Sequence, residues 1–492
     1  MSEHKGVAQE LSDRDIYESK VPVLPSLRPL SLYNQYTNTA AYVIATWLFM
    51  TAAYTGMACP GYLGLIAMIS GNTLGICIVG LYERFYARWG LDKSIGGRVV
   101  FGARAHTPIW FLVFVVVIWG WTVIPTLMFG RSISTVLTDK VGASGWYTNE
   151  LLWAFVFLAI GLWICIKGPI FIKSLFRIVV PIMLGLIILV TVRIFLAHSW
   201  GEVFSIIPAG FAEDPWQSFM IAFELNVATG FSWVMVHSTF SRLGQSEGHG
   251  WLAPVLGYGI TWGIFGIPGF LAGLIAGVED PVYVMVLFGG GWSLIYLLLL
   301  ALANSSSIPL NLWWSALGIR SIWSRFTWVF AVLIQAPVII FLITNKWFYT
   351  HYGTFIALEA ALYSALGFTY LIALWRHNWD VNLKEVYDTS PRSAYYYWKG
   401  VNWFAILSVA IGTTFALLIY DPVNFVVRIP GVFSVLGASL PGGLLAGLVY
   451  FLISKYYLEP RGIGFPNIEK RVKYISELQP DSGQVLNQDV SG

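Results

Sequence analysis

Long apolar runs, separated by short charged or turn-forming segments, dominate the chain. Twelve such runs can be counted, near 39–59, 62–82, 108–136, 148–166, 178–197, 216–238, 252–277, 284–312, 326–345, 352–375, 402–420 and 430–454. A helix that crosses a hydrocarbon core of about 30 Å needs roughly 20 apolar residues. The pattern therefore predicts an all-α protein with twelve transmembrane helices.

Composition supports an integral membrane protein. Of the 492 residues, 57% are hydrophobic and 11% are charged, whereas about 25% are charged in an ordinary soluble domain. We expect a polar N-terminal tail at 1–38, a transmembrane domain at 39–455 and a polar C-terminal tail at 456–492. The bilayer is then the main environment of the chain.

The basic residues predict the orientation. With both termini in the cytoplasm, 24 of the 29 Lys and Arg residues fall on the cytoplasmic side and 4 fall outside, while Arg193 lies within the fifth span. This asymmetry follows the positive-inside rule and predicts a multi-pass protein of the cell membrane. The long basic loop at 81–106 is interpreted as a cytoplasmic anchor near lipid head groups, and not as a nucleic-acid site.

Several classes of function are disfavoured by what the motifs lack. The sequence contains no Walker-type phosphate loop, HExxH pair or GxSxG elbow, which argues against an ATP-driven pump or a familiar hydrolase. A channel is disfavoured because no ring-forming filter segment repeats. Seven histidines in the whole chain give little support to a membrane-embedded enzyme. We expect no cofactor and no obligatory protein partner.

Two spans carry helix-breaking residues at positions that could correspond. The first span holds Thr51, Gly56 and Pro60-Gly61, and the sixth holds Thr229-Gly230 within "ELNVATGFSW". Interruptions at matching positions in two halves are typical of inverted-repeat transporters, whose sites lie at discontinuous helices. The alternative is that these small residues only allow close helix packing.

Two carboxylates lie within the predicted spans. Glu224 is eight residues after Trp216, so it lies roughly 12 Å into the sixth span. It is either a structural acid, with Arg193 as a candidate partner, or a proton carrier or an acceptor for solute N–H groups. Glu359 in the tenth span poses the same choice, although no helix break accompanies it.

Short motifs give the chain a family resemblance. They are "SGN" at 70–72, "GRVVFGARA" at 97–105, "GW" at 120–121 and "FSR" at 240–242. In this order they resemble the nucleobase:cation symporter-1 family, which transports cytosine, uracil, allantoin and hydantoins. The resemblance implies a five-plus-five inverted repeat of leucine-transporter type, with repeats near 39–197 and 216–375 and two extra helices at 402–454. It places the solute between spans one, three, six and eight.

The resemblance also assigns roles to residues. Trp121 matches a tryptophan that stacks on a flat solute, whereas Pro125 replaces an amide and offers no side-chain hydrogen bond. The second stacking tryptophan of the family falls on Gly230, with Phe231 and Trp233 close enough to substitute. Asn304, Ser305 and Ser306 could supply the polar groups of the eighth span.

Together these patterns predict a secondary active transporter that imports a small planar nitrogen-containing solute with a cation. Trp121 would stack on the solute, Trp233 or Phe231 would close the other face, and Glu224 with Asn304 would read its polar groups. The coupling ion would be sodium, held by backbone carbonyls near Phe49, Ala52 and Ala53 and by Ser305 or Ser306, or a proton carried by Glu224. The alternative is an amino-acid or amine transporter on the same scaffold.

Overall fold

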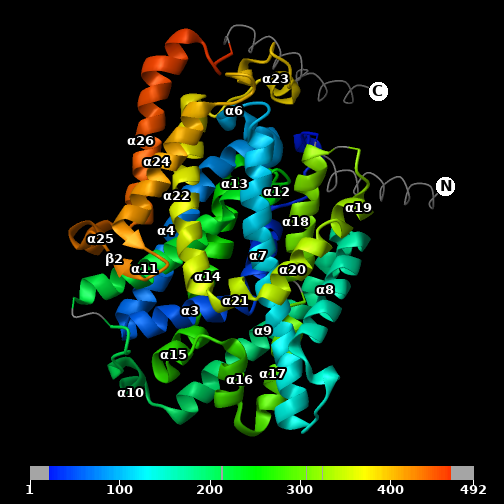
Figure 1. Ribbon diagram of the computed structural model, residues 1–492, viewed down its shortest axis with the longest axis vertical. Helices are drawn as coiled ribbons and strands as arrows, with labels where there is room; N and C mark the ends of the chain where they lie inside the picture. Colours follow the sequence, from blue (N-terminus) through cyan, green and yellow to red (C-terminus); the bar gives the residue numbers. More distant parts are fainter. Residues whose placement is uncertain (1–20, 212–213, 306, 324, 467–492) are drawn as a thin grey trace, which may run out of the picture.

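The chain folds almost entirely into helices (Figure 1). The computed structural model describes residues 21–211, 214–305, 307–323 and 325–466. The longer helices are α4 (Gly61–Trp89), α7 (His106–Thr135), α8 (Glu150–Lys167), α9 (Pro169–Ala197), α11 (Pro215–Phe231), α18 (Ser307–Ile322), α22 (Tyr352–Arg376), α24 (Trp403–Ile419) and α26 (Ser439–Ile453).

Shorter helices complete the spans and the connections between them. They are α2 (Leu32–Val43), α3 (Trp47–Ala58), α5 (Lys93–Gly96), α6 (Arg98–Phe101), α10 (Trp200–Ser205), α12 (Ser238–Ser241), α13 (Glu247–Pro254), α14 (Thr261–Phe265), α15 (Ile267–Ala276), α16 (Pro281–Gly289), α17 (Ser293–Ala303), α19 (Trp328–Leu333), α20 (Ala336–Asn345), α21 (Trp347–Thr350), α23 (Leu383–Tyr387) and α25 (Pro430–Leu436). Strands β1 (Tyr420–Asp421) and β2 (Val426–Val427) pair antiparallel, with Tyr420 opposite Val427.

The apolar runs predicted the helices well. Each of the twelve expected ranges overlaps a described helix or group of helices. By length and composition, eight helices of the described residues could cross a membrane, or up to ten if each bent pair counts as one span. The number twelve therefore stays a prediction. Helix α2 begins at Leu32, seven residues before the expected start of the first span.

One predicted interruption coincides with a helix boundary, because α3 ends at Ala58 and α4 begins at Gly61, directly after Pro60. The other interruptions lie at positions that we did not predict. Thr51 and Gly56 lie inside α3, and the first span instead bends by 66° between α2 and α3, at residues 44–46. Thr229 and Gly230 lie inside α11, which ends at Phe231 and tightens into a 3-10 turn at Ser232–Met235. A further interruption separates α17, which ends at Ala303, from α18, which begins at Ser307.

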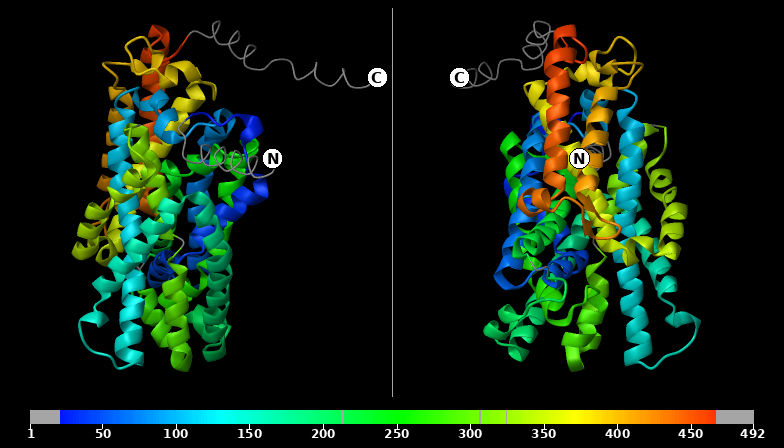
Figure 2. Two further views of the ribbon diagram at one scale, coloured as in Figure 1. Left: turned by 90° about the vertical axis from the view of Figure 1, so that its right-hand side faces the viewer. Right: turned by 60° about the vertical axis from the view of Figure 1, so that its left-hand side comes forward.

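The core of the bundle is closely packed, with α4 beside α11 and α22 beside α24 and α26 (Figures 1 and 2). Gly230 shows how α11 approaches α4, because a Cβ atom at this position would lie 2.6 Å from the backbone oxygen of Asn72 and 2.8 Å from the Cα atom of Gly75. Small residues let two helix backbones meet in this way. The packing alternative for Gly230 is thus the one that its surroundings support.

Glu224 binds the backbone at the second bent helix pair, which consists of α25 and α26. The chain bends by 90° between α25 and α26, and Gly437 at this bend has a positive φ of 69°. The backbone N–H of Ser439 donates to Oε1 of Glu224 at 2.6 Å, the Ser439 hydroxyl donates to the same oxygen, and the N–H of Ala438 donates to Oε2 at 3.2 Å. The carboxylate therefore caps the start of α26, where N–H groups have no partner within the helix.

This contact predicts a structural role for Glu224. Glu224→Ala should lower the free energy of unfolding by about 1 to 3 kcal/mol, because buried donors lose their acceptor. The measurement is thermal unfolding of the purified protein in detergent. The control is Glu202→Ala, which removes a solvent-exposed cap of the short helix α10 and should cost less. An unchanged melting temperature in Glu224→Ala would contradict the capping role.

Candidate solute site

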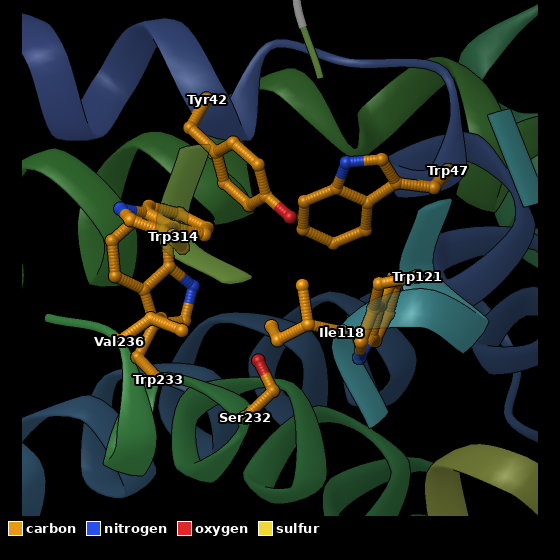
Figure 3. Close-up of a pocket in the computed structure, with 8 residues that line it drawn as sticks. All are labelled: Tyr42, Trp47, Ile118, Trp121, Ser232, Trp233, Val236 and Trp314. Atoms are coloured by element: carbon orange, nitrogen blue, oxygen red, sulfur yellow. The ribbon is translucent and has the colours of Figure 1, made fainter. Parts of the chain in front are cut away.

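A small aromatic cavity lies where the interrupted helices meet. Its volume is about 10 Å³, and its lining residues are Tyr42, Trp47, Ile118, Trp121, Ser232, Trp233, Val236 and Trp314 (Figure 3). They come from α2, α3, α7, the turn after α11, and α18. The space is about that of one water molecule. The side chains themselves fill the site in this conformation.

The indole rings approach the cavity from two sides. Trp47 and Trp121 lie on one side, and Trp233 and Trp314 lie on the other (Figure 3). The ring centroids of Trp47 and Trp121 are 5.0 Å apart with a T-shaped geometry, and those of Trp233 and Trp314 are 5.7 Å apart. Such rings offer flat apolar faces to a planar solute.

Two hydroxyl groups point into the space between these rings (Figure 3). The Tyr42 hydroxyl donates to Oδ1 of Asn311 at 3.0 Å, and the Ser232 hydroxyl donates to the carbonyl of Thr229 at 2.6 Å. Since each hydroxyl has one proton, both can offer only acceptor lone pairs to a solute. Asn311 is itself fixed, because its Nδ2 donates to the carbonyl of Trp121 at 3.1 Å.

The structure brings two of the predicted solute-binding residues, Trp121 and Trp233, to the cavity. Phe231 is fully buried and its ring faces Phe368 of α22 at 6.3 Å. Pro125 is buried one turn beyond Trp121 in α7. These two residues, like Gly230 and Glu224, are not among the residues that line the cavity.

Two carbonyls of the predicted ion site lie against a neighbouring helix. A Cβ atom on Gly269 would lie 2.6 Å from the carbonyl oxygen of Phe49, and one on Gly273 would lie 2.1 Å from that of Ala53, so both carbonyls face α15. Ala52 is buried in the same helix.

On the α17 side of this predicted ion site, Ser305 lies in the gap after α17, and its buried hydroxyl has no hydrogen-bond partner among the described residues. Ser306 lies outside the described residues. Asn304 links the gap after α17 to the bend between α2 and α3, and it is not among the residues that line the cavity. Its Oδ1 accepts a hydrogen bond from the Thr46 hydroxyl, and its Nδ2 donates to the carbonyl of Leu300 at 3.0 Å.

Sequence patterns did not single out Tyr42, Trp47, Trp314 and Asn311. Nothing in the sequence distinguished the three aromatic residues from the others, since aromatic residues make up 16% of the chain. Asn311 did carry a signal, because a buried amide within an apolar span needs partners. Its distance from Asn304, seven residues or about two helical turns, places the two amides on one helical face only if the helix is continuous.

The basic segment at 81–106, which we expected to lie near lipid head groups, also contributes a buried residue to the core. Lys93 is fully buried, its Nζ lies 2.8 Å from Oε1 of Glu83, and it also donates to the carbonyl of Val234 in the turn after α11. Its ammonium group lies 4.3 Å from the ring centroid of Tyr82. Lys93 therefore satisfies a carbonyl within the interrupted sixth span. Arg84 and Arg88, in contrast, are more exposed and pair with Glu247.

A larger cavity of about 480 Å³ lies at the end of α9, between α15 and α16. Arg193, His198 and Tyr283 are among its lining residues. Arg193 forms no ion pair with Glu224 in the described part of the chain. The pairing that the sequence suggested for these two residues is thus wrong in this conformation.

Interrupted apolar helices around a buried polar-aromatic cavity define a membrane transporter of the discontinuous-helix type. Residues 35–438 match the family model described as permeases for cytosine/purines, uracil, thiamine and allantoin. The chain belongs to this permease family and is not an enzyme. It is also 24% identical over 408 residues to a hydantoin permease of Microbacterium maritypicum, covering 77% of this chain and 80% of that protein.

Two solved structures of Mhp1, a nucleobase-cation-symport-1 family transporter, have the same fold. The closed form with bromovinylhydantoin bound has a TM-score of 0.76 at 19% identity, and covers 92% of this chain and 98% of its own. The inward-facing form has a TM-score of 0.78 at 19% identity, with 93% and 97% covered. The all-α transporter fold expected from the resemblance is thereby confirmed.

The buried ion pair yields a prediction about stability. Lys93→Met should lower the free energy of unfolding by about 3 to 5 kcal/mol, because Glu83 would stay buried without its cation. The double variant Lys93→Met/Glu83→Gln should recover most of that loss. Thermal unfolding of the single and double variants is the measurement, and equal loss in both would show that Lys93 acts through packing alone.

Proposed function

We propose that this permease imports a small planar solute rich in N–H groups, such as a nucleobase, a hydantoin or a ureide, together with a cation by alternating access. The observation that carries the proposal is the cavity, in which indole faces approach from two sides and two hydroxyls offer lone pairs. The names of the relatives point to the same class of solute.

The geometry favours amide-like donors over other polar groups. The hydroxyl groups of Tyr42 and Ser232 already donate hydrogen bonds to Asn311 and Thr229. Their oxygen atoms can therefore only accept hydrogen bonds, from N–H groups of the solute. A solute without such donors would leave buried acceptors unpaired, at a cost of about 1 to 3 kcal/mol for each. The hydroxyl groups therefore select solutes that carry N–H donors, and the indole rings supply most of the contact area.

The cavity must expand before it can hold such a ring. At about 10 Å³ it is far smaller than an ordinary ligand pocket of roughly 300 Å³ or more. Tyr42 and Trp47 flank the bend between α2 and α3, and Ser232 and Trp233 lie in the turn after α11. Movement at these two interruptions would admit the solute and expose it to one side of the membrane at a time.

We propose that the protein lies in the cell membrane with both termini in the cytoplasm. Support comes from the distribution of Lys and Arg along the sequence, which gathers in the segments assigned to that side. The described helices that could span a membrane are consistent with several passes.

Ligand binding to the purified full-length chain tests the proposal. A thermal-shift screen would compare cytosine, uracil, allantoin, hydantoin, thiamine, phenylalanine and choline at equal concentrations. A ligand that binds the folded state raises its apparent stability by mass action. We expect shifts with the planar N–H solutes. Shifts confined to phenylalanine or choline would support the amino-acid or amine alternative instead.

Substitution of Trp121 gives a sharper prediction. Trp121→Ala should weaken binding of the solute identified by the screen roughly 5- to 150-fold, because a ring stacked on an aromatic side chain contributes about 1 to 3 kcal/mol. Trp163→Ala, which alters an exposed tryptophan of α8, is the matched control. Equal affinity in both variants would contradict the stacking role of Trp121.

A further inference from the structure

Glu359 of α22 lies behind the cavity and contacts Trp121. Its Oε2 accepts a hydrogen bond from Nε1 of Trp121 at 3.0 Å. Its side chain is buried, and its second oxygen, Oε1, has no hydrogen-bond partner among the described residues. One oxygen of this acid is therefore tied to a residue of the solute site, and the other is free to carry a proton.

The surroundings of Glu359 contain hydroxyl groups and rings but no compensating charge. On its own helix, Tyr352 and Tyr363 lie seven residues before it and four residues after it, on the same helical face. From other elements, Tyr42 of α2 and Tyr258 of residues 255–260 are the ionisable groups near enough to respond to a charge on it. In the described part of the chain, no Lys, Arg, His, Asp or other Glu acts on it or pairs with it.

The other two buried glutamates of the described residues have stronger partners, although Oε2 of Glu83 also has no hydrogen-bond partner there. Glu83 is paired with the ammonium group of Lys93. Glu224 receives hydrogen bonds from Ala438 and Ser439 at the start of α26. Neither is among the residues that line the aromatic cavity or bonds to one of them. Glu359 is the member of this group that combines a contact to the cavity with an unpaired oxygen.

An isolated carboxylate is unstable in a closed, water-free site. Burial without a cation disfavours the charged form, whereas access to water favours it. A site that opens alternately to each side of a membrane would change this access at Glu359 in every cycle. The hydrogen bond from Trp121 would then change in strength, because a charged carboxylate accepts an N–H more strongly than a neutral acid does.

We propose that Glu359 carries the coupling proton, and that its hydrogen bond to Trp121 links protonation to solute binding. This inference rests on the proposed function of the cavity. With the site open outward, Oε1 gains a proton from the external water and forms an O–H bond, while Oε2 keeps its bond to Trp121. With the site open inward, that O–H bond breaks and the proton passes to cytoplasmic water. Hydronium is the proton donor outside and water is the acceptor inside. The empty carrier returns with Glu359 deprotonated, so one positive charge crosses with each neutral solute.

Transport by the full-length chain in proteoliposomes tests this assignment. Uptake of labelled hydantoin, or of uracil if the screen selects it, would be measured with an inward proton gradient, an inward sodium gradient and neither. The variants are Glu359→Gln and, as the matched control for a buried acid away from the cavity, Glu224→Gln, each normalised to folded protein. Gln at 359 keeps an acceptor for Trp121 but cannot release a proton.

The expected results are specific to each arm. The wild type should accumulate solute with the proton gradient, and Glu224→Gln should do the same. Glu359→Gln should bind solute within about threefold of the wild-type affinity, since it resembles the protonated acid in shape and hydrogen-bonding capacity. It should exchange solute across the membrane but lose accumulation that depends on the proton gradient.

Two outcomes would overturn the proposal: proton-driven accumulation that survives in Glu359→Gln, or wild-type accumulation that follows sodium and ignores the proton gradient. If Glu359→Gln does not fold, proton uptake by the wild type on solute addition, read with a pH dye in weak buffer, decides the question. An absence of such uptake overturns the assignment. Failure of the proposed function is distinct, because then no ring solute binds the wild type at all.

Discussion

Every backbone N–H and C=O group inside a membrane needs a partner within the protein, because hydrocarbon offers none. A helix that stops inside the bundle therefore has to be completed by side chains from elsewhere. Here Lys93 donates a hydrogen bond to the carbonyl of Val234 in the sixth span, and Glu224 accepts hydrogen bonds from the N–H groups at the start of α26. Asn304 ties the gap after α17 to Thr46 in the first bend. These contacts let the chain keep irregular backbone at the centre of the bundle.

The aromatic cavity that we propose as the solute site is a consequence of the same interruptions. Where α2 turns into α3 and α11 tightens after Phe231, side chains leave the regular helical spacing and converge. Tyr42, Trp47 and Trp233 meet there with rings from continuous α7 and from α18. The buried hydroxyl groups have their protons engaged by Asn311 and Thr229. The result is a site whose polar groups are oriented before a solute arrives, which lowers the cost of ordering them on binding.

Sequence reasoning succeeded where the signal was local. Apolar length predicted the helices, and two of the predicted solute residues, Trp121 and Trp233, line the aromatic cavity. The positions of the bends were not predictable in this way, because residues 44–46 and 232–235 contain neither Gly nor Pro. Gly230 serves helix packing instead. The two acids could not be told apart either, since the partners of Glu224 follow it by more than 200 positions and Glu359 is defined by its contact with Trp121.

The central claim is that a planar solute lies between the indoles at the two interruptions. The most direct measurement is a structure of the full-length chain determined with the solute that the screen identifies. Our account predicts ring-shaped density against Trp121, with Tyr42 or Trp47 displaced to make room and hydrogen bonds to the Tyr42 and Ser232 hydroxyls. Density elsewhere, such as in the larger cavity at Arg193 and Tyr283, with the aromatic cavity still closed, would contradict it.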